Sequence, residues 1–224
     1  MNSILQKQKD NILVFIVFFI LFWFIIKYLP VDMGLHIRAI VRMNNGTESY
    51  PSHFLFFFIV NLLSFFSNKI LLMTFVTVIV LSLASVGKYV ITKNILSEVA
   101  LNIKKKYKDD VIKVISFALL FCFAIPDVYS FFSLDMMYLG RMPSVVWHNS
   151  TLISVFPFAI LLFWKQLRMF EKEYTTFFNK DILLVSILLV LNIFIKPSFV
   201  LVYIPVTALF IFKEFEIKTY KNFL

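Results

Sequence analysis

Long apolar stretches separated by shorter polar ones dominate the pattern of this chain. A bilayer core of about 30 Å asks for a helix of about 20 residues, with about 17 to 25 accepted. The chain has seven apolar stretches, some of which fall short of this length, and the pattern predicts about six crossings. The apolar segments are 11–29, 53–66, 70–91, 111–125, 151–164, 182–195 and 198–212.

The segment 53–66 decides the predicted topology, because its 14 residues extend only about 21 Å as a helix. That length suits a re-entrant or interfacial element better than a crossing. If it does not cross and the N-terminus is inside, 16 of the 22 Lys and Arg lie inside, as the positive-inside rule favours. If it crosses with the N-terminus still inside, only 5 of the 22 do. A crossing with the N-terminus outside satisfies the count, but separates the start of the chain from the later loops.

The preferred arrangement has a consequence for function. It places the loops 30–52 and 126–150, together with the break at Lys196 and Pro197, on one outer face. These three places also contain the polar residues that are best suited to chemistry.

Composition supports the membrane interpretation. Hydrophobic residues make up 60% of the 224 and charged residues 16%, against about 45–50% and about 25% in soluble domains. A soluble protein with this composition exposes large apolar patches. No repeat and no Gly/Ser linker divides the chain, so we expect one domain, 1–224. The predicted fold is an all-α polytopic transmembrane bundle, with interfacial and re-entrant helices on the outer face.

Charge and motifs narrow the function classes. The net charge of +9 comes largely from Lys between apolar runs, which fits anionic headgroups and the positive-inside rule rather than nucleic acid. The single cysteine, Cys122, provides neither a disulfide framework nor a cysteine metal site. The chain has no phosphate-binding Gly-rich loop and no His-Glu-x-x-His helix, which argues against soluble nucleotide chemistry. The first apolar run lacks a small-residue cleavage site, which predicts an uncleaved span.

The first outer loop carries Asp32, His36, Arg38 and Arg42. One interpretation is an amphipathic surface helix over 32–43 with Asp32 as its N-cap. The other is a carboxylate general base beside cationic groups that hold a phosphate.

Farther along, Pro51 suits the first turn of a helix, and His53 opens the apolar run that follows. His53 is either an interfacial residue or part of the same site.

The second outer loop contains Arg141, Trp147, His148 and Asn149. Trp147 suits an aromatic belt at a membrane boundary, and Asn149 suits a cap of the following helix. The same residues also offer the stacking and hydrogen bonding that a sugar needs.

Lys196-Pro197 interrupts the apolar stretch 182–212. A single helix of that length is about 46 Å long, so we expect two helices that meet near Lys196. A lysine in such a stretch is costly unless it reaches headgroups, a cavity or an anion. Snorkelling to the headgroups and contact with a lipid phosphate are the two interpretations.

The order of these features resembles the N-terminal part of the GT-C superfamily of polytopic glycosyltransferases. The resemblance rests on Asp32 with His36, Tyr50-Pro51-Ser52-His53, Trp147-His148-Asn149-Ser150-Thr151 and Lys196-Pro197-Ser198. In that family the first outer loop supplies the catalytic carboxylate, and the donor is a polyprenyl-phosphate sugar. The resemblance therefore implies that Asp32 is the catalytic base. It implies a substrate-binding set of His36, Arg38, Arg42, His53, Arg141, Trp147, His148, Asn149 and Lys196.

Two features depart from the family pattern. Many members have two neighbouring acidic residues in the first loop, whereas Asp32 stands alone. Members are also usually much longer, so the chain is either a fragment or lacks an acceptor-binding part.

The resemblance implies a glycosyltransferase that takes a sugar from a polyprenyl phosphate on the outer face of a bacterial inner membrane. Its partners are this lipid-linked sugar and membrane lipid. The alternative is a polysaccharide polymerase, a flippase or a transporter-like protein without glycosyl transfer. The residues identify no metal ligand set and no cofactor, and a divalent cation is left open.

Overall fold

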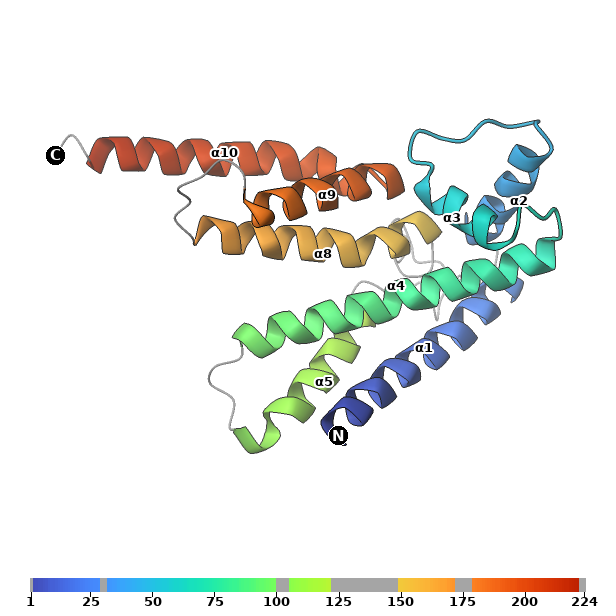
Figure 1. The fold of residues 1–224 in the computed structure, drawn as a ribbon, viewed down its shortest axis with the longest axis horizontal. Coiled ribbons are helices and arrows are strands. Elements are labelled where there is room, and N and C mark those ends of the chain that lie inside the picture. The colour runs from blue at the N-terminus through green and yellow to red at the C-terminus, as the bar shows by residue number, and fades with distance from the viewer. Residues whose placement is uncertain (1, 29–31, 100–104, 122–148, 172–178, 222–224) are drawn as a thin grey trace, which may run out of the picture.

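The computed structural model describes residues 2–28, 32–99, 105–121, 149–171 and 179–221, and these ranges are helical apart from short connections (Figure 1). The described residues contain no β-strand. The helices are α1 (Asn2–Tyr28), α2 (Asp32–Asn44), α3 (Leu55–Leu63), α4 (Ile70–Val99), α5 (Lys105–Phe121), α8 (Ser150–Phe170), α9 (Lys180–Ile195) and α10 (Ser198–Lys221).

Three of these helices are long and apolar enough to cross a membrane: Gln8–Tyr28 of α1, Ile70–Val99 and Ser150–Phe170. The 16 residues of α9 fall just below the length of a crossing. The 17 residues of α5 reach that length but include several charged side chains. The part of the chain that the structure describes is therefore all-helical, with three candidate spans. The predicted break at Lys196 and Pro197 is confirmed, because α9 ends at Ile195 and α10 begins at Ser198.

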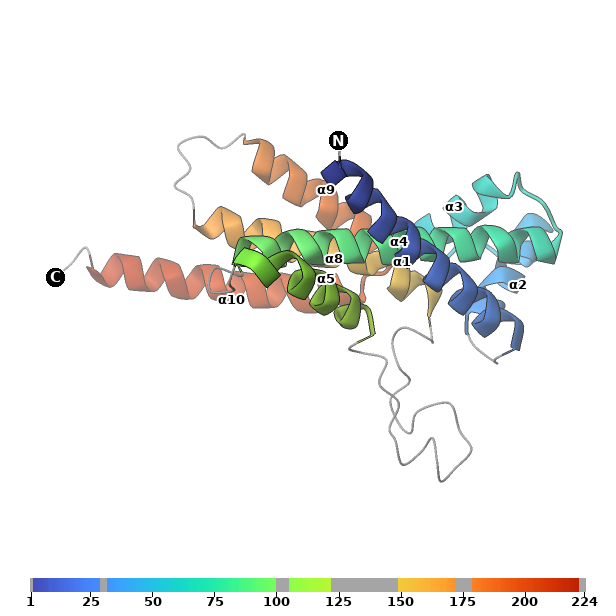
Figure 2. The same ribbon diagram turned by 90° about the horizontal axis from the view of Figure 1, so that it is seen from below.

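The long helix α4 is the centre of the bundle and contacts α1, α5 and α8. In Figure 2, α1 crosses α4 and α5 runs close beside it. Buried aromatic and aliphatic side chains join these helices, among them Phe18 and Phe22 of α1, Leu81 of α4 and Leu120 of α5. Each such side chain contributes about 1.5–3 kcal/mol when water is the alternative, although in lipid close packing carries more of the association.

Helices α4 and α8 approach each other closely where Gly87 meets Pro157. A Cβ atom built on Gly87 lies 3.3 Å from the Cβ atom of Pro157, so glycine leaves the room for this contact. Pro157 lies inside α8 and has no N–H to offer the carbonyl one turn earlier. This crossing forms one wall of the groove described below.

Helix α2 confirms the predicted amphipathic helix in the first loop. Met33, Ile37 and Ile40 face the bundle and are buried, at the spacing that places residues on one helix face. A turn follows α2, with Gly46 in the left-handed region at φ 72°.

The helix in the segment 53–66 is shorter than predicted and begins later. It spans only Leu55–Leu63, about 14 Å, so Pro51 and His53 precede the helix instead of starting it. Phe65 and Phe66 end it by adopting φ angles of 54° and 53°. Helix α1 ends and α4 begins at the same end of the bundle (Figure 1), so the segment between them starts and finishes at that end.

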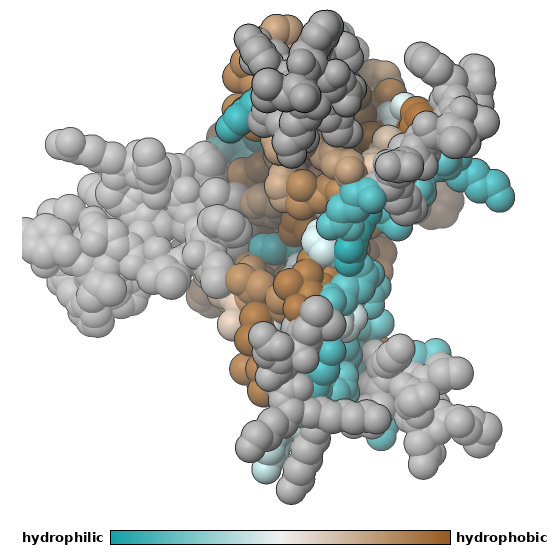
Figure 3. All heavy atoms as spheres, turned by 90° about the vertical axis from the view of Figure 1, so that its left-hand side faces the viewer, coloured by the Kyte–Doolittle hydropathy of each residue, from teal (hydrophilic) through white to brown (hydrophobic). Residues whose placement is uncertain are grey.

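Ion pairs tie the helices together at the opposite end. Asp10 accepts from Lys93 at 3.3 Å and pairs with Lys113 at 3.5 Å, joining α1 to α4 and α5. Arg168 of α8 pairs with Glu98 of α4 at 3.0 Å. Figure 3 shows hydrophilic residues gathered beside apolar ones where this end faces the viewer.

Candidate functional site

Polar residues from three distant parts of the sequence meet at the end of the bundle where α4 begins. They come from α2, from the N-terminus of α8 and from the break between α9 and α10, and His53 joins them from the segment before α3. One hydrogen bond links α2 to α8, and another links the α9–α10 break to α8. We call the group formed by Asp32, His36, His53, Thr151 and Lys196 the polar cluster.

His36 connects α2 to α8. Its Nδ1 atom lies 2.5 Å from the Oγ atom of Ser150, whose side chain is fully buried. The imidazole also packs edge-on against Phe57, with ring centroids 5.2 Å apart. Three helices therefore fix the orientation of this ring, and its tautomer decides whether Ser150 donates or accepts.

Lys196 connects the α9–α10 break to α8. Its Nζ atom donates to the Oγ1 atom of Thr151 over 3.4 Å, and the Thr151 hydroxyl in turn donates to the Oδ1 atom of Asn149 over 2.5 Å. The same Oδ1 atom accepts from the backbone N–H of Leu152. The interpretation of Asn149 as a helix cap is thus confirmed, and its cap oxygen also orients the hydroxyl beside the lysine.

The electrostatics of the polar cluster are dominated by Lys196. Burial lowers the pKa of the Lys196 ammonium, while the charge of Asp32 acts in the opposite direction. Burial, followed by the charge of Lys196, lowers the pKa of His53 below its ordinary value. Among the described residues Lys196 has no carboxylate at ion-pair distance, so these residues compensate its charge only in part.

Asp32 is the first residue of α2. A carboxylate in the first turn of a helix is stabilised by the unsatisfied N–H groups there. Asp32 and His36 are four residues apart and so lie on the same face of the helix. This places the predicted base one turn from the imidazole that contacts Ser150.

Two of the predicted phosphate ligands do not join the polar cluster. Arg42 is exposed and pairs with Glu48 at 2.6 Å, near the far end of α2. Arg38 is also exposed, because residues two positions apart, such as His36 and Arg38, point to different sides of a helix. The predicted residues Arg141, Trp147 and His148 lie outside the described residues.

Ser150 and Thr151 belong to the site but were missing from the predicted set. Their signal in the sequence was their place directly after Asn149, where hydroxyls enter the first turn of an apolar helix. A hydroxyl at this position is usually read as part of a helix cap, which conceals its second contact.

An apolar groove of about 450 Å³ begins beside the polar cluster. Three of its lining residues are close to the cluster in sequence: Leu55 lies two residues after His53, Ser154 follows Thr151 by about one turn, and Ile195 directly precedes Lys196. The groove continues between α4 and α8 past Gly87 and Pro157 to Ile91. A charged head and a hydrocarbon surface therefore adjoin.

An amide pair fixes α2 against α3 and so positions the two histidines. Asn44 donates to Asn61 over 2.9 Å, and Asn61 donates back over 2.7 Å. Asn61 is almost fully buried and also donates to the hydroxyl of Tyr50. Loss of such a buried polar partner costs about 1–3 kcal/mol.

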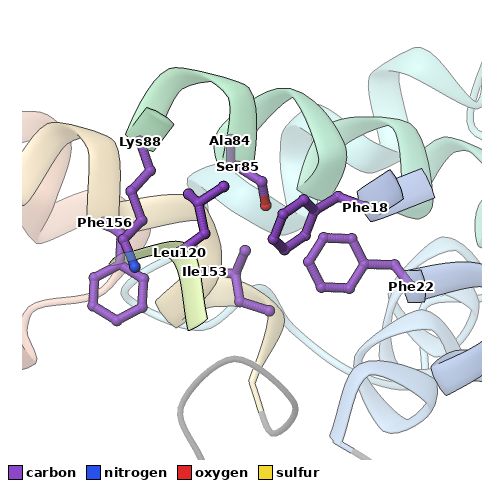
Figure 4. A pocket seen from close by; sticks show the side chains of 8 residues that line it. All are labelled: Phe18, Phe22, Ala84, Ser85, Lys88, Leu120, Ile153 and Phe156. Carbon is purple, nitrogen blue, oxygen red and sulfur yellow. The ribbon is translucent and has the colours of Figure 1, made fainter. Parts of the chain in front are cut away.

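Lys88 of α4 is also buried, and the cavity beside its side chain is too small for a ligand. The Nζ atom lies 4.9 Å from the ring centre of Phe156, which favours a cation–π interaction. The adjoining cavity of about 10 Å³ (Figure 4) has room for about one water molecule. Within the described residues, no group of three or more His, Cys, Asp or Glu side chains is arranged to hold a metal ion.

Comparison of the chain with known protein families, with curated proteins and with solved structures finds no match.

Proposed function

We propose that this chain is a membrane-embedded glycosyltransferase that moves a sugar from a polyprenyl-phosphate donor to an acceptor hydroxyl on the outer face of a bacterial inner membrane. The single observation that carries the proposal is the contact between Lys196 and Thr151 next to the apolar groove. A lipid phosphate needs a cation and hydroxyl donors, and its chain needs an apolar surface.

The cation in the polar cluster suits an anionic ligand. Lys196 is half-buried and donates to a neutral hydroxyl instead of a carboxylate. A phosphate oxygen beside its Nζ atom supplies the charge that Asp32 supplies only in part. His53 is close enough to feel the charge of the same lysine, and its imidazole N–H offers a second donor.

The groove suits the hydrocarbon part of the donor. Its lining comes from α3, α4, α8 and α9, and the residues next to the polar cluster are apolar apart from Ser154. A chain that lies in this groove brings its phosphate to the N-terminus of α8, where free N–H groups also favour an anion.

In the proposed reaction Asp32 takes the proton from the acceptor hydroxyl. The acceptor oxygen attacks the anomeric carbon, forming the new C–O bond with inversion. The bond between that carbon and the phosphate oxygen breaks, and its electron pair leaves with the phosphate. Lys196 stabilises the negative charge that develops there.

The alternative is a flippase, polymerase or transporter-like protein that binds the same lipid. The apolar groove and Lys196 serve that function equally, but Asp32 then has no proton to accept. Substitution of Asp32 therefore separates the two functions.

The test is sugar transfer in vesicles that contain the purified chain, a panel of soluble oligosaccharide acceptors and a panel of radiolabelled polyprenyl-phosphate hexoses. We expect Asp32→Asn to lower transfer about 10²–10⁴-fold while binding of polyprenyl phosphate persists. The matched control is Asp110→Asn, an exposed carboxylate on α5, which leaves transfer unchanged. Equal transfer by the two variants contradicts the role of Asp32. Binding without transfer from any donor favours the flippase.

A further inference from the structure

Phe65 and Phe66 end α3 in an unusual backbone conformation. Their φ angles are 54° and 53°, in the left-handed region that bulky L-residues rarely adopt. Glycine or asparagine fits such a position with less steric conflict. Two consecutive phenylalanines there suggest that the side chains serve a purpose that offsets the backbone cost.

The conformation is held by hydrogen bonds. The N–H group of Phe65 donates to the carbonyl of Leu62 over 3.0 Å, and that of Phe66 donates to the carbonyl of Asn61 over 2.9 Å. Asn61 is itself fixed by the amide pair with Asn44. The two phenylalanines therefore project from a rigid support.

Both side chains point away from the protein. Phe65 is 86% exposed and Phe66 is 55% exposed. The neighbouring Leu62 and Leu63 are exposed as well, so the end of α3 presents a continuous apolar surface. We call Phe65 and Phe66 the aromatic knuckle.

The place of the aromatic knuckle in the chain indicates what covers it. The candidate span of α4 begins at Ile70, only four residues after Phe66, and the polar residues Asn68 and Lys69 stand between them. A span that starts here sets this region at the boundary of a bilayer, where lysine reaches the headgroups and aromatic rings sit just below them.

We propose that the aromatic knuckle inserts into the boundary between lipid headgroups and acyl chains, on the side of the bilayer where α4 begins. The inserted rings hold α3, and through the Asn44–Asn61 pair also α2, at a fixed depth. Helix α2 carries Asp32 and His36 of the polar cluster. The binding of the rings to lipid does not rest on the proposed enzymatic function.

The chain has a single native cysteine, Cys122, so one substitution removes all background labelling. In a Cys122→Ser background, Phe65→Cys is labelled with an environment-sensitive fluorophore and the chain is placed in phosphatidylcholine vesicles that contain one quarter phosphatidylglycerol. We expect blue-shifted emission, strong quenching by lipids with a nitroxide near the headgroup, and little quenching by iodide in the water. Ser49→Cys, in the exposed loop before α3, is the matched control and is quenched mainly by iodide.

A second variant tests the anchoring itself. Phe65→Asn together with Phe66→Asn keeps residues that tolerate the left-handed backbone but removes the rings. A label at position 58 on α3, introduced by Phe58→Cys, should then become several-fold more accessible to iodide, while a label introduced by Leu201→Cys on α10 does not change. Equal iodide quenching at positions 65 and 49 contradicts the proposal. So does energy transfer between labels at position 65 that rises with the protein-to-lipid ratio, because it shows that a second copy covers the rings.

Discussion

The lysines at the two ends of the helical bundle have different partners. At the end where α1 begins, Asp10 lies between Lys93 and Lys113 at 3.3 and 3.5 Å, so carboxylates compensate the lysines. At the other end Lys196 is half-buried and meets the hydroxyl of Thr151 at 3.4 Å. Asp32 acts on Lys196 only from a longer distance.

This difference separates a structural role from a binding role. Carboxylates that pair with a lysine compensate its positive charge, so such a lysine attracts an anionic ligand only weakly. Its contacts serve to hold helices together. A partly desolvated lysine beside hydroxyl groups raises the energy of the folded protein until an anion arrives. The comparison therefore points to the end with Lys196 as the place where an anionic ligand binds.

The largest expected effect on stability comes from removing a charge at the end of the bundle where α1 begins. Asp10→Asn removes the charge shared by Lys93 and Lys113, which are partly buried. We expect the free energy of unfolding to fall by about 1–2 kcal/mol, with a Tm lower by several degrees in detergent. Thermal unfolding followed by circular dichroism measures this.

Two variants serve as its controls. Asp110→Asn removes an exposed carboxylate from the same end and should change stability by less than about 0.5 kcal/mol. Lys196→Met keeps the length of the side chain and removes a poorly compensated charge, so stability should stay equal or rise. A loss of stability in Lys196→Met as large as that in Asp10→Asn contradicts the distinction between the two ends.

A smaller effect concerns the titration of His53. Burial and then the charge of Lys196 lower its pKa, so the folded protein resists protonation and loses stability as the pH falls through the unfolded value of about 6.5. In Lys196→Met the pKa of His53 should rise, while burial still keeps it below the ordinary value. Because the chain has three histidines, NMR of ¹³C-labelled histidine resolves this titration.

The control is Lys113→Met, which removes a lysine from the other end of the bundle. In that variant the pKa of His53 should stay unchanged. If the pKa of His53 does not change in Lys196→Met, the charge of Lys196 does not act on His53.

Much of the helical layout could be predicted because it depends on local patterns. The sequence predicted an amphipathic helix over 32–43, where α2 lies, and the break at Lys196 and Pro197 before α10. The bounds of α3 could not be predicted, because its end depends on Phe65 and Phe66 adopting a conformation that their side chains disfavour. The prediction of six spans is supported for three helices.

The site could be predicted in part. The sequence pointed to Asp32, His36, His53 and Lys196, and the fold brings their segments to one end. The sequence did not predict that Arg42 forms an ion pair with Glu48, because this pair depends on how the loop after α2 folds back. Ser150 was missed because only the approach of α2 to α8 turns a helix-start serine into a partner of His36.

The most direct test of the account is the binding of polyprenyl phosphate by the purified chain, compared with polyprenol, which lacks only the phosphate. Native mass spectrometry from detergent micelles measures both. We expect the phosphate form to be bound preferentially, and Lys196→Met to weaken its binding about 10–100-fold while Lys113→Met, at the other end, does not. If the chain binds the alcohol as well as the phosphate, or if Lys113→Met weakens binding as much as Lys196→Met, the polar cluster is not a lipid-phosphate site.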